Sequence, residues 1–237
     1  MDEQNMAFAG NCPKSALDMD RAECQPRAGC QSVAPVASVP AWDEAVVTLR
    51  SGDLNAMHRR VWRVLTDGIP NCKERDFLYA PLVDGDDGRV AVLVRSAHLP
   101  EHLGGVVRRV MPERGHTSDF RLLLRLEHKS SRTGRSTLYE EVETVEWLSA
   151  QFQDHGLALN GEPDLIRSAE RLTRHGYNTD IPYWEIYGSL SVKDRDVAAP
   201  LILGGLGRLK GFGFGLLMFG AKIGERRGDP GVADRAA

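Results

Sequence analysis

The sequence predicts an α+β protein with two tandem domains, each of mixed strands and helices. Two observations predict this fold class. In each half of the chain, short segments with the apolar and polar alternation of half-buried strands are interleaved with longer segments whose apolar residues recur at helical spacing. In the first half these segments come in the order β-α-β-β-α-β, which is the order of a ferredoxin-like, or RRM-like, domain, and the second half is interpreted as a second such domain. At 237 residues, with 42% hydrophobic and 27% charged residues, the chain has room for two such domains.

The first domain is predicted over residues 42–126. Its first strand covers 44–50. The helix that follows is capped by Ser51 or Asp53 and extends to about residue 65, because apolar residues recur there at core spacing, namely Leu54, Met57, Val61 and Leu65. Strands over 76–81 and 89–96 enclose a turn rich in Asp and Gly. A short helix over 101–111 and a strand over 120–126 complete the domain.

The second domain is predicted over residues 139–222, after a basic hairpin or linker over 127–138. Its predicted elements are a helix over 139–155, strands over 156–160, 165–171 and 183–192, a helix over 195–203 and a last strand over 212–219. A polar, Pro- and Ala-rich stretch over 1–41 is expected to be a flexible extension, and residues 223–237 a disordered tail.

A glycine-rich loop precedes the last predicted strand and carries two cations, Arg208 and Lys210. Glycines permit positive φ and close backbone approach, and the cations suit a polyanion. A dinucleotide-binding fingerprint does not fit, because only 22 residues follow Gly215, and a P-loop does not fit, because Gly211 follows Lys210. The segment is therefore interpreted as a phosphate-binding loop, with a glycine-rich hairpin at a sheet end as the alternative.

Charge is distributed unevenly along a chain whose net charge is only −3. Residues 104–136 hold eight Lys or Arg and three acids, whereas residues 137–165 hold seven acids and no Lys or Arg. This segregation fits either a one-sided electrostatic surface or a solvated face. The four cysteines show no CxxC spacing, no signal peptide is visible, and Arg208 and Lys210 interrupt the one long apolar run, so a cytoplasmic protein without a membrane span is expected.

Several stretches, in order along the chain, resemble the CRISPR repeat-processing endoribonucleases and among them the CasE family of the type I-E Cascade complex. The stretches are Met57-His58-Arg59-Arg60-Val61-Trp62, Arg75-Asp76-Phe77-Leu78-Tyr79, 92–100, Leu124-Arg125-Leu126, Glu146-Trp147-Leu148, and 187–192 through the glycine-rich loop. The resemblance spans about residues 44–219. The chain departs from the family pattern in its N-terminal stretch, in Glu127-His128-Lys129-Ser130 where Arg-Ala-Asn-Pro is usual, and in Asn55 where some members carry Tyr.

The resemblance implies a protein that binds the hairpin of CRISPR repeat RNA, cuts it at the base of the stem and stays bound as a subunit of a Cascade-type complex. It implies His58 as the catalytic residue of a 2′-hydroxyl attack that uses no metal and no cofactor. On spacing alone, His58 fits a histidine packed at the edge of an apolar helix face. The implied RNA-binding residues are Arg59, Arg60, Arg63, Arg125, Lys129, Arg132, Arg135, Gly205, Gly207, Arg208, Lys210, Gly211 and Gly213.

Two functions from other classes stay open at this stage. The first is a non-catalytic crRNA-binding subunit of a related complex, such as type IV, which Asn55 in place of Tyr would suit. The second is an unrelated nucleotide-binding enzyme with a glycine-rich loop.

Overall fold

The computed structural model describes residues 39–66, 76–84, 87–129, 132, 136–174 and 176–220, and every strand pair within these ranges is antiparallel. The predicted tail over 223–237 lies outside the described residues. So does the predicted extension as far as residue 38.

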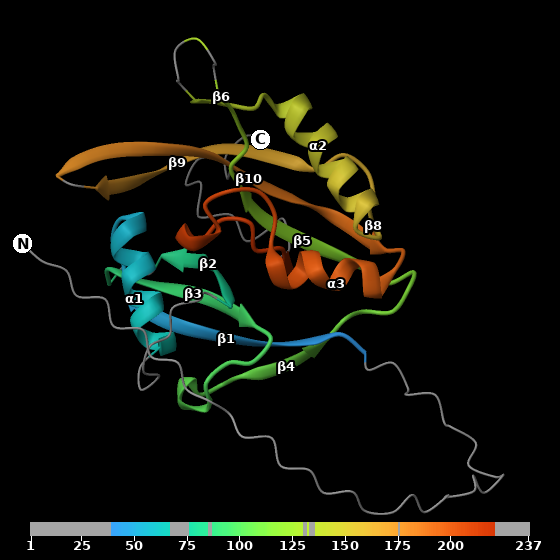
Figure 1. The fold of residues 1–237 in the computed structure, drawn as a ribbon, viewed down its shortest axis with the longest axis horizontal. Coiled ribbons are helices and arrows are strands. Elements are labelled where there is room, and N and C mark those ends of the chain that lie inside the picture. Colours follow the sequence, from blue (N-terminus) through green and yellow to red (C-terminus); the bar gives the residue numbers. More distant parts are fainter. Residues whose placement is uncertain are drawn as a thin grey trace, which may run out of the picture. The chain divides into compact units, whose positions relative to one another are not determined.

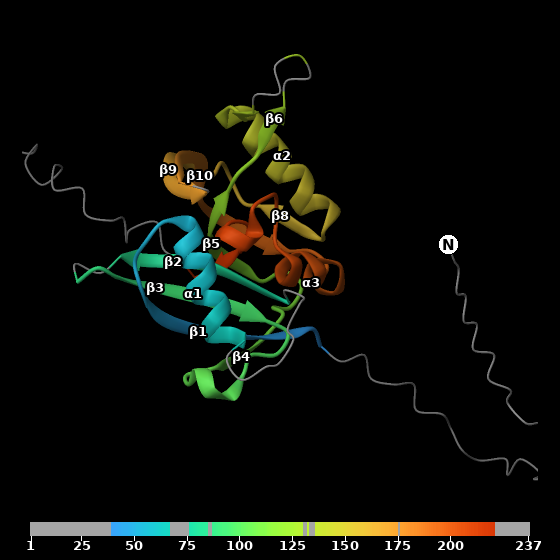
Figure 2. The same ribbon diagram turned by 60° about the vertical axis from the view of Figure 1, so that its left-hand side comes forward.

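The first sheet has four strands in the order β2-β3-β1-β4 (Figure 1). They are β1 (Ala41–Arg50), β2 (Phe77–Asp84), β3 (Arg89–Ser96) and β4 (Val107–Val110). Helix α1 (Leu54–Thr66) covers one face of this sheet (Figure 2). The predicted core positions Leu54, Met57, Val61 and Leu65 are all buried, which confirms the helix and the buried face predicted from their spacing.

The short helix predicted over 101–111 is wrong. A 3₁₀ turn covers Glu101–Leu103, and the chain then forms β4, which pairs with β1 from Ala41↔Val110 to Glu44↔Val107. All four β4 side chains are exposed, so this segment has no apolar stripe to bury as a helix. Hydrogen bonding to β1 satisfies its backbone instead.

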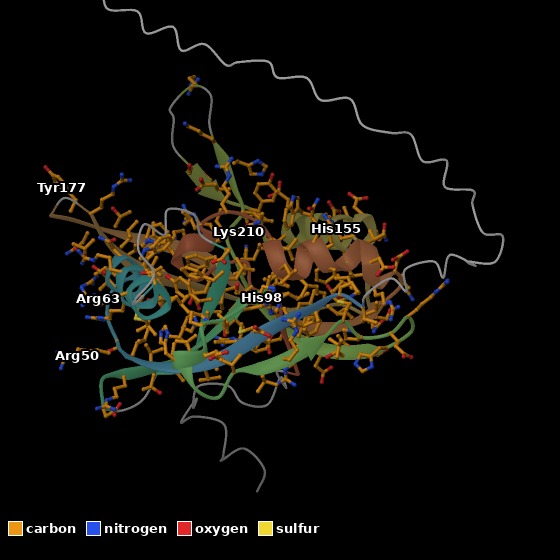
Figure 3. All side chains as sticks on the ribbon, turned by 60° about the horizontal axis from the view of Figure 1, so that its bottom comes forward. Arg50, Arg63, His98, His155, Tyr177 and Lys210 are labelled. Carbon is orange, nitrogen blue, oxygen red and sulfur yellow. The ribbon has the colours of Figure 1, made fainter. Side chains whose placement is uncertain are left out.

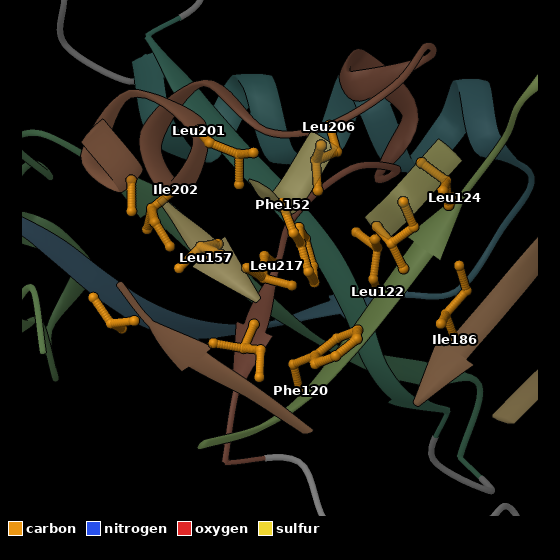
Figure 4. Close-up of a cluster of buried hydrophobic side chains, with 14 of the residues drawn as sticks. Phe120, Leu122, Leu124, Phe152, Leu157, Ile186, Leu201, Ile202, Leu206 and Leu217 are labelled. Atoms are coloured by element: carbon orange, nitrogen blue, oxygen red, sulfur yellow. The ribbon is translucent and has the colours of Figure 1, made fainter. Parts of the chain in front are cut away.

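The second sheet has the order β11-β5-β10-β8, with β9 pairing along the first part of β10. Its strands are β5 (Thr117–Leu124), β8 (Leu157–Leu159), β9 (Asp164–Arg174), β10 (Tyr177–Val192) and β11 (Met218–Phe219). Helices α2 (Glu141–Asp154) and α3 (Arg195–Gly204) bury their apolar faces against it. Figure 4 shows the resulting core, in which Phe152 of α2 and Ile202 of α3 belong to the same buried cluster as Phe120 and Leu122 of β5.

The strand predicted to complete the first domain is β5, and it belongs to the second sheet. Phe120, Leu122 and Leu124 are fully buried in the core under α2 and α3. Alternation specified the strand and its buried face, but it carries no information about the partner strand. The fold is α+β with two tandem ferredoxin-like domains, the first of which has a 3₁₀ turn in place of its second helix.

The last strand is also shorter than predicted. Instead of a strand over 212–219, a 3₁₀ turn covers Lys210–Phe212 and only Met218–Phe219 pair with β5. Gly213 and Gly215 have φ of 93° and 82°, outside the β region, so a regular strand cannot continue through them. Residues 127–129 and 136–138 pair as β6 (Glu127–Lys129) and β7 (Ser136–Leu138), a separate two-stranded hairpin.

A buried arginine joins the two sheets. Arg95 of β3 is 1% exposed, and its Nε and Nη2 donate to Glu44 Oε1 at 2.9 and 2.6 Å. Its Nη1 donates to the carbonyl of Ile202 in α3 at 3.2 Å. The guanidinium lies over the rings of Trp42 and Phe219, 5.2 and 5.7 Å from their centroids. One side chain therefore contacts β1, α3 and β11.

Candidate functional site

His58 lies on the partly exposed side of α1. The helix begins after Asp53, whose Oδ1 accepts the Ala56 N–H at 2.7 Å. Hydrogen bonds from the Thr173 side chain and the Ala56 backbone hold the pKa of Asp53 below its ordinary value. Because the apolar stripe of α1 faces the first sheet, His58 is left at its edge, half-buried.

His58 meets the glycine-rich segment from the far end of the chain. Its Nδ1 is 2.6 Å from the carbonyl oxygen of Gly211, 153 residues away in sequence. The imidazole lies beside two aromatic rings, with its centroid 6.0 Å from that of Trp62 and 5.4 Å from that of Phe212. The structure thus brings together the helix and the loop that the sequence singled out separately.

A second side chain, which the sequence analysis missed, contacts the same carbonyl. Tyr79 of β2 is 1% exposed, and its hydroxyl donates to the Gly211 oxygen at 3.0 Å. Tyr79 sits in a predicted strand as an ordinary buried aromatic. Nothing in sequence spacing separates it from a core residue.

The glycines of the segment pack against protein. Gly207 has φ of 69°, and a Cβ there would lie 2.8 Å from Leu124 Cδ1. A Cβ on Gly213 would lie 3.1 Å from Tyr79 Cε2. Gly205 follows α3 and packs against Leu78. The close approach that these glycines permit is therefore used within the fold, between the segment, β2 and β5.

The two cations of the segment also have protein partners. Lys210 Nζ donates to the carbonyls of Gly204 and Gly205, both at 2.7 Å, at the C-terminal end of α3 where a cation is favourable. Arg208 is 67% exposed and its Nη1 lies 3.2 Å from Glu127 Oε1. Its side chain is therefore the more accessible of the two.

Arg125 is mostly buried. Its Nη1 donates to the Pro182 carbonyl at 2.8 Å and its Nη2 to Glu127 Oε2 at 2.7 Å. Burial alone would raise the pKa of the Glu127 carboxyl, but Arg125 and Arg208 together hold it below its ordinary value. Arg125 thus connects β5 to β10 and to the start of β6.

The remaining predicted RNA-binding arginines and lysines differ in exposure. Arg60 Nη1 donates to the carbonyls of Arg50 and Ser51 at 2.6 and 2.8 Å, which ties α1 to the end of β1. Arg59 and Arg63 are exposed on α1, and Figure 3 shows Arg63 pointing outward. Lys129 and Arg132 are exposed on and after β6, whereas Arg135 lies outside the described residues.

Strand β9 contributes a further basic surface beside α1. Asn55 Nδ2 donates to the Thr173 carbonyl at 3.2 Å, so Asn55 helps to hold β9 on α1. The exposed arginines of this strand are Arg167, Arg171 and Arg174. Near them Tyr177, labelled in Figure 3, is 78% exposed. Three arginines within eight residues, directly after the acidic stretch, are the sequence signal that could have identified this surface.

The described part of the chain has a cavity of about 320 Å³ where α1 and β2 meet β5 and β10. Aromatic and apolar side chains form most of its walls, including Tyr79, Tyr183, Phe212 and Phe214. Glu170 is the one charged side chain among the described residues that line it, and neither Arg208 nor Lys210 does so. This lining does not suit the phosphates of a nucleotide.

The family model for "CRISPR associated protein" matches residues 37–220. The chain belongs to this family. A search of curated proteins found no match.

Solved CRISPR structures share the fold at low sequence identity. CRISPR endoribonuclease Cse3 bound to a 19 nt RNA matches with a TM-score of 0.60 and 20% identity over 76% of this chain and 99% of that chain. Cas6e from Escherichia coli str. K-12 matches with a TM-score of 0.57 and 20% identity over 77% and 100%. A chain of a CRISPR RNA-guided surveillance complex matches with a TM-score of 0.56 and 18% identity over 76% and 100%.

Two further properties concern the described residues alone. No helix among them has the length and apolar character needed to cross a membrane. They also contain no group of three or more His, Cys, Asp and Glu side chains placed to hold a metal ion.

Proposed function

We propose that this protein is an endoribonuclease that binds the stem-loop of CRISPR repeat RNA, cuts it at the base of the stem and stays bound to the product. The observation that carries the proposal is His58, partly exposed, with Nδ1 on the Gly211 carbonyl and with the exposed arginines of α1 on the same helix. Family membership and the fold shared with an RNA-bound Cse3 support the substrate class.

The proposed reaction is transesterification by the RNA itself. The 2′-hydroxyl beside the scissile phosphate attacks phosphorus, leaving a 2′,3′-cyclic phosphate and a 5′-hydroxyl. This route needs a proton-transferring group that works near neutral pH, and histidine is the side chain best suited to that task. His58 is proposed as this group, in a reaction that proceeds without a metal ion.

The proposed RNA surface combines α1, β9 and the β6–β7 hairpin. Arg59 and Arg63 are exposed on α1, and β9 lies beside this helix, held by the hydrogen bond from Asn55 to the Thr173 carbonyl. A-form RNA presents phosphates and a narrow, deep major groove, so such a surface would bind mainly through backbone charge. Lys129 and Arg132 extend the positive charge along the hairpin.

Arg208 and Lys210 are both proposed to contact RNA phosphates, but they differ in the protein contacts that each must give up to do so. Arg208 is 67% exposed and has one ion-pair partner, Glu127, which Arg125 also contacts, so Arg208 can turn to a phosphate while Glu127 keeps a partner. Lys210 would have to release two carbonyls at the end of α3. Arg208 is therefore the better candidate for a direct phosphate contact.

A cytoplasmic location and assembly with other Cascade-type subunits are proposed with this function, because a similar chain occurs in a CRISPR RNA-guided surveillance complex. Sequencing the RNA that copurifies with the expressed protein tests the proposal. We expect repeat-derived fragments that end at the base of the stem. Recovery of unrelated cellular RNA alone would contradict it.

A non-catalytic crRNA-binding subunit of a related complex is the second candidate. Asn55 favours it, because its amide is occupied by the Thr173 carbonyl and it supplies no phenol beside His58. Copurified RNA would still derive from repeats in that case. Purified protein would then leave an uncut repeat hairpin intact.

A further inference from the structure

We infer that the Gly211 carbonyl, held in place by Tyr79, keeps the hydrogen of His58 on Nδ1 and so makes Nε2 the nitrogen that exchanges a proton with RNA. Tyr79 is then a positioning residue of the site. The inference rests on the proposed function for its substrate, but the geometry that carries it belongs to the free protein.

The first step concerns the hydrogen on the ring. A carbonyl oxygen can only accept a hydrogen bond, so the 2.6 Å contact with Gly211 requires a hydrogen on Nδ1 of His58. In the neutral imidazole the lone pair then lies on Nε2. Among the described residues Nε2 has no hydrogen-bond partner, and His58 is partly exposed.

The second step concerns what holds the carbonyl. Its oxygen has two lone pairs, and the Tyr79 hydroxyl donates to it at 3.0 Å beside His58. Tyr79 is buried in β2, opposite Val94 of β3, so its position is fixed by the sheet. Its ring also packs on Gly213, the residue that directly follows the 3₁₀ turn containing Gly211. Tyr79 therefore restrains both the direction of the carbonyl and the turn that presents it.

Contacts within the 3₁₀ turn over Lys210–Phe212 also restrain the Gly211 peptide. The Phe212 N–H donates to the Leu209 carbonyl at 2.7 Å, and Leu209 has φ of 58°, which is unusual for a residue with a side chain. The Phe212 ring lies beside the imidazole, tilted at 46° to it with the centroids 5.4 Å apart. These contacts leave the Gly211 peptide little freedom to turn away from His58.

The arrangement defines one proton route. Nε2 of neutral His58 takes the proton of the 2′-hydroxyl as the 2′ oxygen forms its bond to phosphorus. The bond from phosphorus to the 5′ oxygen breaks, and the leaving oxygen takes a proton from water. The hydroxide left behind takes the proton from Nε2, which returns His58 to its neutral form. Tyr79 donates no proton to the RNA in this scheme, and its contribution passes through the direction of the imidazole.

The test is nitrogen NMR of the free protein labelled with ¹⁵N-histidine, at alkaline pH where imidazoles are neutral. His58 is assigned by its loss in His58→Asn. We expect a protonated Nδ1 and an unprotonated Nε2. Tyr79→Phe, which keeps the ring and removes the hydroxyl, should mix the two His58 tautomers and slow single-turnover cleavage about three- to tenfold, the scale of one net hydrogen bond.

His155 provides an internal control, because its Nδ1 lies 2.8 Å from the Gln151 carbonyl at the end of α2. Its tautomer and the affinity for hairpin RNA should be unchanged in Tyr79→Phe. Hydrogen on Nε2 of His58 in the wild type overturns the inference without any variant. So does a Tyr79→Phe protein with the wild-type tautomer and rate. Because the spectra need no RNA, failure of the wild type to cut counts against the proposed function alone.

Discussion

Arg95 and Arg109 bind the same carboxylate in different surroundings, and replacing each with methionine separates a buried ion pair from an exposed one. Arg95 Nη2 is 2.6 Å from Glu44 Oε1 with 1% of its side chain exposed, whereas Arg109 Nε is 3.2 Å from Oε2 with 57% exposed. Glu44 itself is only 13% exposed. Arg95→Met therefore leaves a nearly buried carboxylate without its main partner, and removes the donor to Ile202.

The two substitutions should lower the free energy of unfolding by amounts that differ severalfold. Breaking a buried pair by removing one partner lowers the free energy of unfolding by about 3–5 kcal/mol. Arg109 is exposed and Glu44 keeps its contact with Arg95 when Arg109 is replaced, so Arg109→Met should cost at most about 1 kcal/mol. Urea unfolding at neutral pH measures both, with equal m-values showing that the comparison concerns stability alone. Equal costs for Arg95→Met and Arg109→Met would refute the assignment of Arg95 as the residue that joins the two sheets.

Three further predictions follow from the described contacts. The difference in free energy of unfolding between the wild type and Arg95→Met should become smaller below about pH 4.5. Burial raises the pKa of Glu44, but Arg95 and Trp42 outweigh burial and hold it below its ordinary value of 4.5. The ionised carboxylate therefore stabilises the fold above pH 4.5, and this stabilisation is lost as pH falls through the lowered pKa. A difference that is constant with pH would contradict this. Gly213→Ala should lower stability by about 2 kcal/mol, because φ is 93° and the new Cβ would lie 3.1 Å from Tyr79 Cε2. Thermal unfolding measures this loss, and an unchanged melting temperature would refute the proposed packing. Arg63→Ala should weaken hairpin RNA binding and flatten the slope of log K against log salt by about 0.7–0.9, as measured by filter binding. An unchanged slope would exclude Arg63 from phosphate contact.

The sequence predicted local elements well where a pattern repeats within one element. The four apolar residues of α1 from Leu54 to Leu65 fix its length and its buried face, and the structure confirms both. The alternation within a strand does not identify its partner strand, so the sequence predicts β5 in the first domain whereas it belongs to the second sheet. The helix expected over 101–111 failed because pairing with β1 outweighed a weak helical pattern.

The candidate site was predictable only in part. His58 could be named from the resemblance, but its contact with Gly211 depends on a fold that brings together residues 153 apart. Tyr79 looks like core, and Lys210 looks like a free cation although it donates to the end of α3. The spacing of residues along the chain predicts which side chains share a face of a helix or strand. The roles of these three side chains depend instead on the backbone carbonyl that each one contacts in the folded protein.

The central claim, that His58 transfers the proton in cutting by the 2′-hydroxyl, is tested most directly by single-turnover cleavage of a repeat hairpin in EDTA. His58→Ala should keep hairpin affinity and lose about two or more orders of magnitude in rate, the scale of an acid–base group. The matched control His155→Ala, which removes a half-buried histidine with the same kind of carbonyl contact, should cut at the wild-type rate. A 2′-deoxy nucleotide just 5′ of the cut should abolish cleavage by the wild type. Cleavage by His58→Ala at the normal rate, or cleavage of the deoxy substrate, would contradict the account.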